Sequence, residues 1–334
     1  MKRRDLLLTS VSSVASASAI TTLGFPGIVL AQPQPLDFPK AGNTLKYIVP
    51  FPPGGLTDTM ARTVAQKLTE SWKVPVVVEN KAGGNAQIGA EQVAKSTPDG
   101  SSLLAITLTH AANVSLFPDA PYSFARDLRP VALLAGSPML VVVPAASPVQ
   151  NFKDLMALAK SKQLNAGSSG NGTPPHLTMA LFNDLNKSQM THVPYRGGAP
   201  SMVDLIGGQI DVIFSNFPES IAHVKGGKLR ALALCSLSRH PMLPEVPTAM
   251  ESGMSGLFVE NWTGAMIQAQ TPNVIVDKYS REMIKILYSA EVEERARLQG
   301  FRVTPKGSGD FGVFIKSEIE RWSRIIKSAK ITAT

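Results

Sequence analysis

The sequence predicts an α/β fold of two lobes, in which each lobe is a mainly parallel sheet flanked by helices. Apolar runs alternate with segments of helical periodicity along almost the whole chain, as expected for strands covered by helices. The chain of 334 residues also exceeds what one typical hydrophobic core accommodates. We expect two crossings between the lobes, near residues 137–148 and 256–268. Lobe 1 then comprises residues 45–140 and 263–334, and lobe 2 comprises residues 141–262.

The first 31 residues have the features of a signal peptide. Lys2, Arg3 and Arg4 precede an apolar stretch rich in small residues, which ends at Ala31 in a small-residue cleavage pattern. Serine, threonine and glycine residues dilute this stretch too much for a stable membrane span. We therefore expect an exported protein, and both the general secretory route and the twin-arginine route stay open.

Charge and cysteine content narrow the classes of partner. Removing residues 1–31 takes away three basic residues and one acidic residue, which lowers the net charge from +8 to +6. The remaining basic residues are scattered, so the sequence mildly favours acidic partners and shows no stripe for binding nucleic acid. The single cysteine, Cys235, lies in an apolar strand-like run and cannot form an internal disulfide. Packing must therefore hold the exported chain together.

The first half of the chain is predicted to consist of strands connected by helices. Met60, Val64 and Leu68 recur every four residues, which predicts a helix that ends near Trp72. Another helix is expected to begin at Ile88. The predicted strands of this half cover residues 45–51, 74–80, 102–109, 131–135 and 139–143.

The second half repeats the alternation and ends in helices. Asn151 is placed to cap a helix over residues 152–160, and three further helices are expected to begin after prolines. These prolines are Pro175, Pro200 and Pro218, and the predicted strands cover residues 190–195, 210–216 and 229–237. From Phe311 to Ile326, apolar residues recur at spacings of three or four, so the tail is expected to be helical and to cover lobe 1.

The loop of residues 50–58, Pro-Phe-Pro-Pro-Gly-Gly-Leu-Thr-Asp, joins the first predicted strand to its helix. Gly54 and Gly55 let the backbone turn sharply and expose the first helical amides, which have no intrahelical partner. Together with the positive end of the helix dipole, these amides can receive a small anion such as a carboxylate. The alternative is that the glycines only shape the turn and that Asp58 only complements the dipole.

Other loops also follow predicted strands, where open α/β sheets place their ligands. Each loop alone is more often a simple turn, but several loops from two lobes are expected to converge on one interdomain cleft. Arg196 could pair with an anion or be solvated. The candidates that these loops supply are Pro53, Asn85, Gln87, His110, Gly170, Arg196, Gly197 and Asn216.

Catalytic signatures are absent from the sequence of these loops. Asn171 stands where the nucleophile-elbow pattern needs a glycine, and neither a dinucleotide fingerprint nor a Gly-Lys-Ser/Thr phosphate loop occurs. The cysteine and histidines have no spacing typical of a zinc site. The loops offer many hydrogen-bond donors and few bases, which favours holding an anion over transforming it. We therefore expect no catalytic residue, no metal and no cofactor.

A series of short motifs follows in order from about residue 45 to residue 330. They include residues 50–58, His192-Val193-Pro194-Tyr195 and Gly198-Ala199-Pro200. Further motifs lie at residues 76–80, 97–100, 109–113, 168–174, 207–211, 227–233 and 244–248. Together they resemble the extracytoplasmic solute receptors of tripartite tricarboxylate transporters, also called the Bordetella uptake gene ("Bug") group.

This resemblance implies a periplasmic binding protein of the type II-like, Venus-flytrap kind, which closes on a small ligand that is commonly a carboxylate. It also implies that backbone amides and ordered waters recognise the carboxylate. Two departures bear on the identity of the ligand: Gln87 replaces an asparagine of the family pattern, and Ser215 stands where aspartate is frequent. Carried onto this chain, the resemblance points to Phe51, Gly54, Thr57, Asp58, Ser169, Asn171, Gly172, Thr173, Tyr195, Gly198 and Ala199.

We therefore expect a monomeric periplasmic receptor that captures a small organic acid or amino acid. It would deliver this solute to the membrane subunits of a tripartite transporter. One alternative is a receptor that presents its ligand to a membrane kinase, which the sequence does not distinguish. Another is a periplasmic α/β hydrolase or transferase that uses Ser169 and His176.

Overall fold

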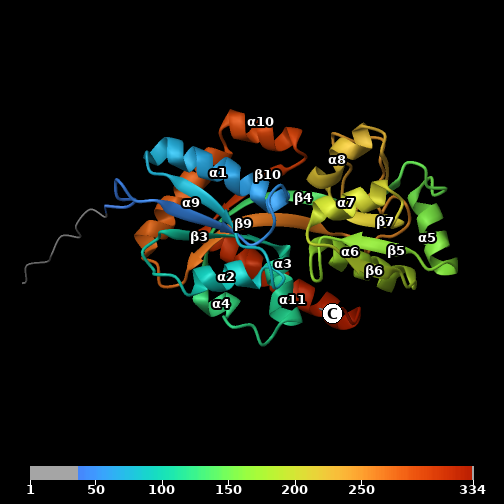
Figure 1. Ribbon diagram of the computed structural model, residues 1–334, viewed down its shortest axis with the longest axis horizontal. Helices are drawn as coiled ribbons and strands as arrows, with labels where there is room; N and C mark the ends of the chain where they lie inside the picture. The colour runs from blue at the N-terminus through green and yellow to red at the C-terminus, as the bar shows by residue number, and fades with distance from the viewer. Residues whose placement is uncertain (1–36, 333–334) are drawn as a thin grey trace, which may run out of the picture. The chain divides into compact units, whose positions relative to one another are not determined.

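Strands and helices alternate along residues 37–332, the part of the chain that the computed structural model describes (Figure 1). The predicted signal peptide, residues 1–31, lies outside the described residues. The strands are β1 (Leu45–Val49), β2 (Val76–Asn80), β3 (Ser102–Thr107), β4 (Leu128–Pro144), β5 (Asn165–Ser168), β6 (Thr191–Pro194), β7 (Val212–Asn216), β8 (Leu229–Leu234), β9 (Glu260–Gln268) and β10 (Arg302–Gly307). The helices are α1 (Leu56–Trp72), α2 (Gln87–Ala94), α3 (Leu108–Leu116), α4 (Phe124–Asp127), α5 (Phe152–Ser161), α6 (Pro174–Asn186), α7 (Gly198–Ile206), α8 (Phe217–Lys225), α9 (Asn273–Leu287), α10 (Ala290–Leu298) and α11 (Ser308–Ser328).

The strands form two sheets that share β4. Their order is β2-β1-β3-β9-β4-β7-β5-β6, with β10 and β8 also paired to β4. The outer pairs are parallel, as predicted: β1 with β2 and β3, and β5 with β6 and β7. The central strands β4 and β9 run antiparallel to their neighbours. Residues of β4 up to Pro138 pair with β9, and from Met139 onward they pair with β7, so the chain crosses between the sheets inside one strand.

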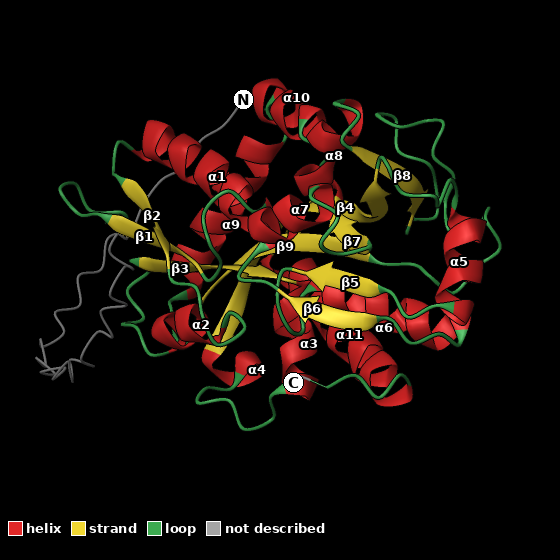
Figure 2. Cartoon of the chain, turned by 45° about the vertical axis from the view of Figure 1, so that its right-hand side comes forward, coloured by secondary structure: helices red, strands yellow, loops and turns green. Residues whose placement is uncertain are grey.

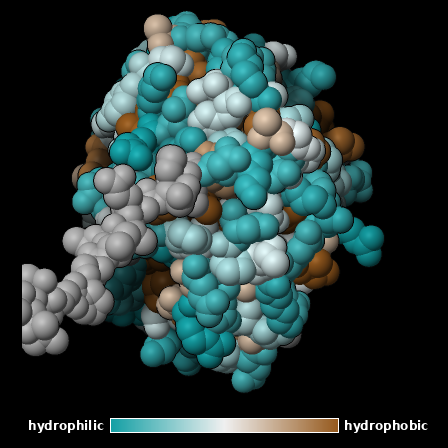
Figure 3. Space-filling model, turned by 90° about the vertical axis from the view of Figure 1, so that its left-hand side faces the viewer, coloured by the Kyte–Doolittle hydropathy of each residue, from teal (hydrophilic) through white to brown (hydrophobic). Residues whose placement is uncertain are grey.

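Side-chain alternation in the strands separates the hydrophobic core into layers. In β1, Tyr47 and Val49 pack into the layer beneath α1 and α9, whereas Ile48 packs into the layer on the opposite face. This follows from the two-residue period of a strand, which sends successive side chains to opposite faces. Helices therefore cover both faces of the sheets (Figure 2). At the end of the molecule that carries β1 and β2, hydrophobic residues are scattered among hydrophilic ones on the surface (Figure 3).

The predicted elements and the observed ones differ at a few places. Two predicted strands, residues 131–135 and 139–143, are parts of the single strand β4. The first strand ends at Val49 because proline at position 50 cannot donate to a ladder. The strands β5 and β10 were not predicted, and each lacks the apolar run that marks a buried strand. The boundaries of the two lobes stay a prediction.

The C-terminal helix α11 is fixed to β9 by a buried carboxylate. Glu318 accepts hydrogen bonds from Trp262 Nε1 at 2.9 Å and from Trp322 Nε1 at 3.4 Å, and it pairs with Arg321 at 3.3 Å. Trp322 is fully buried among the residues of this core layer.

Among residues 37–332, no helix has both the length and the apolar character needed to cross a bilayer.

Replacing Glu318 with alanine should destabilise the fold. The substitution leaves two buried indole N–H groups without their acceptor, so the free energy of unfolding should fall by about 2–4 kcal/mol. Urea unfolding followed by tryptophan fluorescence measures this loss. Glu320→Ala, on the exposed side of the same helix, should change stability by less than about 0.5 kcal/mol. Equal effects of the two substitutions would contradict this role of Glu318.

Candidate functional site

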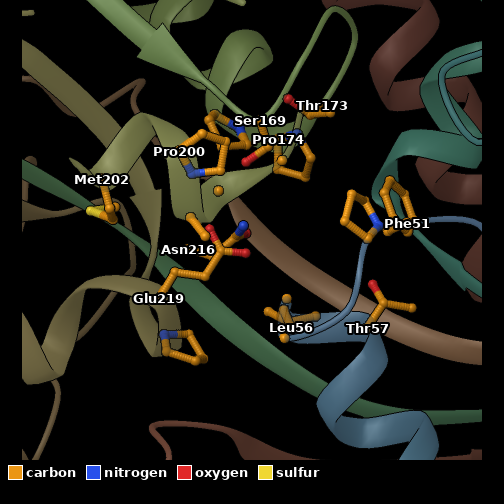
Figure 4. A pocket seen from close by; sticks show the side chains of 18 of the residues that line it. Phe51, Leu56, Thr57, Ser169, Thr173, Pro174, Pro200, Met202, Asn216 and Glu219 are labelled. Carbon is orange, nitrogen blue, oxygen red and sulfur yellow. The ribbon is translucent and has the colours of Figure 1, made fainter. Parts of the chain in front are cut away.

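A cavity of about 430 Å³ lies where loops from both sheets meet. Its walls come from the loops after β1 and β3 and from β9 in one sheet, and from the loops after β5, β6 and β7 in the other. Figure 4 shows Phe51, Leu56 and Thr57 on the wall at the start of α1, with Asn216 and Glu219 on the wall at the start of α8. Pockets for small ligands commonly have volumes of about 300–1,000 Å³. The cavity therefore has room for a small molecule.

Four helices begin at this cavity without a side-chain cap. Gly55, Thr173, Gly197 and Asn216 are the N-cap residues of α1, α6, α7 and α8, and all four line the cavity. None of these N-cap side chains accepts a hydrogen bond from its helix. The first amides of a helix lack intrahelical acceptors and lie at the positive end of the dipole. The cavity thus collects hydrogen-bond donors and positive potential.

Asp58 holds the loop before α1 in place. Its carboxylate accepts hydrogen bonds from Gly54 N at 2.9 Å, Arg62 Nε at 2.9 Å and Asn80 Nδ2 at 2.8 Å. Burial acts to raise the pKa of Asp58, but the hydrogen bonds from Arg62, Gly54 and Asn80 outweigh it and hold the pKa below its usual value of 3.8. Asp58 is buried behind the loop and does not line the cavity. Its contacts therefore brace the start of α1.

The start of α3 supplies the cavity with Thr109, a buried lining residue. Thr107 caps this helix by accepting from Thr109 N at 3.1 Å, and His110 Nδ1 accepts from Thr107 N at 3.1 Å. Thr109 lines the cavity and is fully buried, and its Oγ1 has no hydrogen-bond partner within residues 37–332. A buried unpaired polar group costs free energy, which a bound ligand could recover.

A chain of polar side chains forms the wall between β9 and α8. Asn261 Nδ2 donates to Asn216 Oδ1 at 2.8 Å, and Asn216 in turn hydrogen-bonds to Glu219. Glu219 also accepts a hydrogen bond from the backbone N–H of Leu56, at the start of α1. Burial raises the pKa of Glu219, and the hydrogen bonds from Asn216 and Leu56 oppose this shift. The oxygen Asn261 Oδ1 is buried and has no partner in the described part of the chain.

The start of α7 approaches the other walls closely. Gly197 has φ +111°, a conformation that favours glycine, and a β-carbon there would lie 3.3 Å from Pro52 Cγ. A β-carbon on Gly198 would lie 2.3 Å from a carboxylate oxygen of Glu219. Beyond these glycines, the side chains of Met202, Val203 and Ile206 give the cavity an apolar wall. The cavity is therefore polar on some sides and apolar on another.

The structure brings eleven of the nineteen predicted ligand-binding residues to the cavity lining. These are Phe51, Pro53, Gly54, Thr57, Ser169, Thr173, Arg196, Gly197, Gly198, Ala199 and Asn216. The other eight lie outside the lining: Asp58, Asn85, Gln87, His110, Gly170, Asn171, Gly172 and Tyr195.

Several of the residues outside the lining brace the loops that form it. Tyr195 Oη donates to Asp204 at 2.7 Å, and the carbonyl of Gly170 accepts from Thr173 Oγ1 at 2.6 Å. Asn85 exchanges hydrogen bonds with Asn113, and a β-carbon on Gly172 would lie 2.5 Å from Asn85 Nδ2.

Gln87 and His110 line a separate depression beside α4. His110 is fully buried there, and burial lowers its pKa to about 4.

Five polar residues of the cavity lining were not among the predicted ligand-binding residues: Thr107, Thr109, Glu219, His223 and Asn261. Glu219 follows Pro218 in the first turn of a helix, where an acidic residue is ordinary, so its sequence position carries no signal. Asn261 lies inside an apolar strand-like stretch, and only the folded sheet places it beside Asn216. Thr109 directly precedes the predicted ligand-binding residue His110, but the structure places Thr109, and not His110, in the cavity lining.

The histidine of the predicted hydrolase alternative is engaged in a structural contact. His176 Nδ1 accepts from Gly172 N at 2.9 Å, and its ring stacks on His192 with centroids 3.9 Å apart. Burial, with a smaller contribution from His192, lowers the pKa of His176 to about 3. Within residues 37–332, no group of three or more His, Cys, Asp or Glu side chains is arranged to hold a metal ion.

A comparison with models of protein families shows to which family this chain belongs. The family model "Tripartite tricarboxylate transporter family receptor" matches residues 60–331. The chain belongs to this receptor family. Its members are periplasmic solute-binding receptors that work with tripartite transporters, so the fold, the periplasmic location and the receptor function follow from membership.

Curated relatives match along nearly the full length of this receptor. A protein of the tcbD-tcbE intergenic region of Pseudomonas sp. (strain P51) is 35% identical over 307 residues, which cover 90% of each chain. The protein BugT of Bordetella pertussis is 33% identical over 312 residues, covering 92% of this receptor and 94% of BugT.

Solved structures show the same two-lobed fold. The periplasmic binding protein BugD has a TM-score of 0.82 and 30% identity, covering 86% of this receptor and 98% of BugD. A protein of R. palustris with adipate has a TM-score of 0.84 and 30% identity, covering 88% and 99% of the chains. MatC of Rhodopseudomonas palustris with bound malate has a TM-score of 0.79 and 29% identity, covering 85% and 98%.

Replacing Asp58 with alanine should destabilise the receptor by about 1–3 kcal/mol at neutral pH, because Gly54 N and Asn80 Nδ2 lose their acceptor. A group whose pKa is lowered by folding stabilises the native state above its unfolded pKa and loses this effect as the pH falls. The difference between wild type and variant should therefore shrink as the pH falls below 3.8.

Urea unfolding at several pH values measures this difference. Asp119→Ala, at an exposed position, is the control and should have little effect at any pH. A difference that grows on acidification would contradict the bracing role of Asp58.

Proposed function

We propose that this receptor captures a small carboxylate-bearing solute in the cavity and delivers it to the membrane subunits of a tripartite transporter. The observation that carries the proposal is the convergence of four uncapped helix starts, from both sheets, on one cavity. Backbone amides at helix starts are suited to an anion because they supply both donors and positive potential. The unpaired hydroxyl of Thr109 adds a further donor at the same place.

The size and polarity of the cavity support a small organic acid or amino acid. A volume of about 430 Å³ suits a molecule of a few carbon atoms better than a polymer. The hydroxyls of Thr57 and Ser169 can donate to a carboxylate, while the apolar side chains of α7 can contact its carbon chain. Two relatives with similar structures contain adipate and malate, and we extend this class of ligand to the present receptor.

Closure of the two lobes would then enclose the solute. We assign residues 45–140 and 263–334 to one lobe and residues 141–262 to the other, with the chain crossings as hinges. The change of pairing partner at Met139 in β4 supports one hinge there. A solute can shift the population toward the closed state only if it binds that state more tightly than the open one. The membrane subunits would recognise the closed form.

Export to the periplasm and a monomeric state are also part of the proposed function. The N-terminal residues 1–31 would direct the chain to the periplasm and then be removed. The receptor would act there as a monomer, without a catalytic residue, metal or cofactor.

The substitution Thr109→Val tests the proposed binding site. It keeps the shape of the side chain but removes the hydroxyl, so the affinity for the solute should fall by about 10- to 100-fold. Stability should not decrease, because this hydroxyl has no hydrogen-bond partner among the described residues. Isothermal titration with a panel of mono-, di- and tricarboxylates first identifies the ligand and then compares the variants.

Thr271→Val provides a matched control. Thr271 is also buried, and its Oγ1 is likewise unpaired among residues 37–332. Because Thr271 does not line the cavity, its replacement should leave the affinity for the solute unchanged. If the folded wild type bound none of the acids in the panel, this result would contradict the proposed function. Equal effects of the two substitutions would remove Thr109 from the binding site.

A further inference from the structure

A carboxylate of the protein itself lies at the helix starts where a solute carboxylate would be expected. Glu219 accepts a hydrogen bond from Leu56 N, the first residue of α1. Its Oε2 lies directly against Gly198, the first residue of α7, because a β-carbon there would be only 2.3 Å away. Glu219 is itself in the first turn of α8. The starts of three helices therefore surround one anionic side chain, which satisfies the preference of these dipoles for negative charge.

The carboxylate also determines the direction of the neighbouring amide groups. A carboxylate only accepts hydrogen bonds, so Asn216 must turn its Nδ2 toward Glu219 and its Oδ1 away. Asn216 Oδ1 then accepts from Asn261 Nδ2 at 2.8 Å, which leaves Asn261 Oδ1 as the end of the chain. This oxygen is buried and has no partner among residues 37–332, and the residue Asn261 lines the cavity. An unpaired buried acceptor needs a donor, and a second carboxylate cannot supply one.

We propose that Glu219 is a specificity-determining residue, which selects solutes that present a hydrogen-bond donor, rather than a second carboxylate, to this wall. The donor is an ammonium, amide or hydroxyl group at the end opposite the anchoring carboxylate. A dicarboxylate would place a second charge near Glu219 and leave Asn261 Oδ1 unpaired. Unpaired charges and like-charge contacts of this kind discriminate between ligands of equal size. The inference depends on the proposed function, because it assumes that the solute enters this cavity.

Isosteric pairs of solutes test the selection directly. Each pair consists of a dicarboxylate and its monoamide, such as succinate with succinamate and glutarate with glutaramate, over chains of about three to six carbons. Titration calorimetry should show that wild type binds the monoamide at least about tenfold more tightly than the diacid. In Glu219→Gln, which keeps the size of the side chain, this preference should disappear or reverse. A preference of wild type for the diacids, or a monoamide preference that persists in the variant, would overturn the proposal.

Chemical rescue tests the position of the carboxylate without requiring the natural solute. In Glu219→Ala, Leu56 N and Asn216 Nδ2 lose their acceptor, and added acetate can take its place. At constant ionic strength, acetate at about ten times its dissociation constant should raise the melting temperature of the variant by about 2–4 °C. Acetamide should have no such effect, because it lacks the charge. Wild type and Glu293→Ala, which alters an exposed acidic residue in the first turn of α10, should also show none.

The two measurements separate this inference from the proposed function. Acetate rescue confined to Glu219→Ala supports a carboxylate position filled by Glu219, even if no acid or monoamide of the panel binds wild type. A failure of every acid and monoamide to bind wild type would contradict the proposed function and leave the position of Glu219 supported. Equal acetate dependence of wild type, Glu219→Ala and Glu293→Ala would overturn the assignment of Glu219. If Glu219 acted only in stability, Glu219→Ala would lower the melting temperature, acetate would not restore it, and Glu219→Gln would keep the solute preference of wild type. This result would overturn the proposal.

Discussion

The backbone N–H groups at the start of a helix must find acceptors, and this requirement organises the candidate site. Helix starts favour an N-cap residue whose side chain accepts one of these N–H groups. Among the helices of residues 37–332, Thr107 and Asn151 cap α3 and α5 in this way, and the other helices lack such a cap. What distinguishes α1, α6, α7 and α8 is that their uncapped starts meet at one cavity. The shared strand β4 makes this arrangement possible, because it joins two sheets whose loops then face one space.

The protein meets part of this requirement itself. Asp58 supplies acceptors behind the α1 loop, and Glu219 supplies one within the cavity. These carboxylates have different consequences. Asp58 is enclosed by Arg62, Asn80 and Gly54 and stabilises the loop, whereas Glu219 borders open space and so bears on which solute fits. One structural principle thus links the local stability of the loops to the selectivity of the site.

Much of the fold could be predicted from the sequence because periodicity reports burial directly. The repeat of Met60, Val64 and Leu68 and the apolar strand β3 are local signals, and both elements occur where they were expected. The merging of residues 131–135 and 139–143 into β4 was not predictable, because pairing with β9 and then β7 carries the strand through Pro138. The strand β10 depends likewise on its pairing with β4.

The site was predictable to the extent that glycine and proline mark the loops. The loops around Gly54, Ser169 and Gly198 do line one cavity. Sequence could not tell a residue that faces the cavity from one that braces it, as Tyr195 and Asp58 illustrate. The sequence also contains no signal for Asn261 or Glu219. Their places in the cavity wall arise only from contacts between segments that are distant in the chain.

A crystal structure of the receptor with its bound solute would test the central claim most directly. The account predicts solute density within the cavity, in hydrogen-bonding contact with loop residues of both sheets, including Thr109 from one and Ser169 from the other. Density confined to another depression, such as the one beside His176 and Lys187, would contradict the account. Contacts with the loops of only one sheet would contradict it as well.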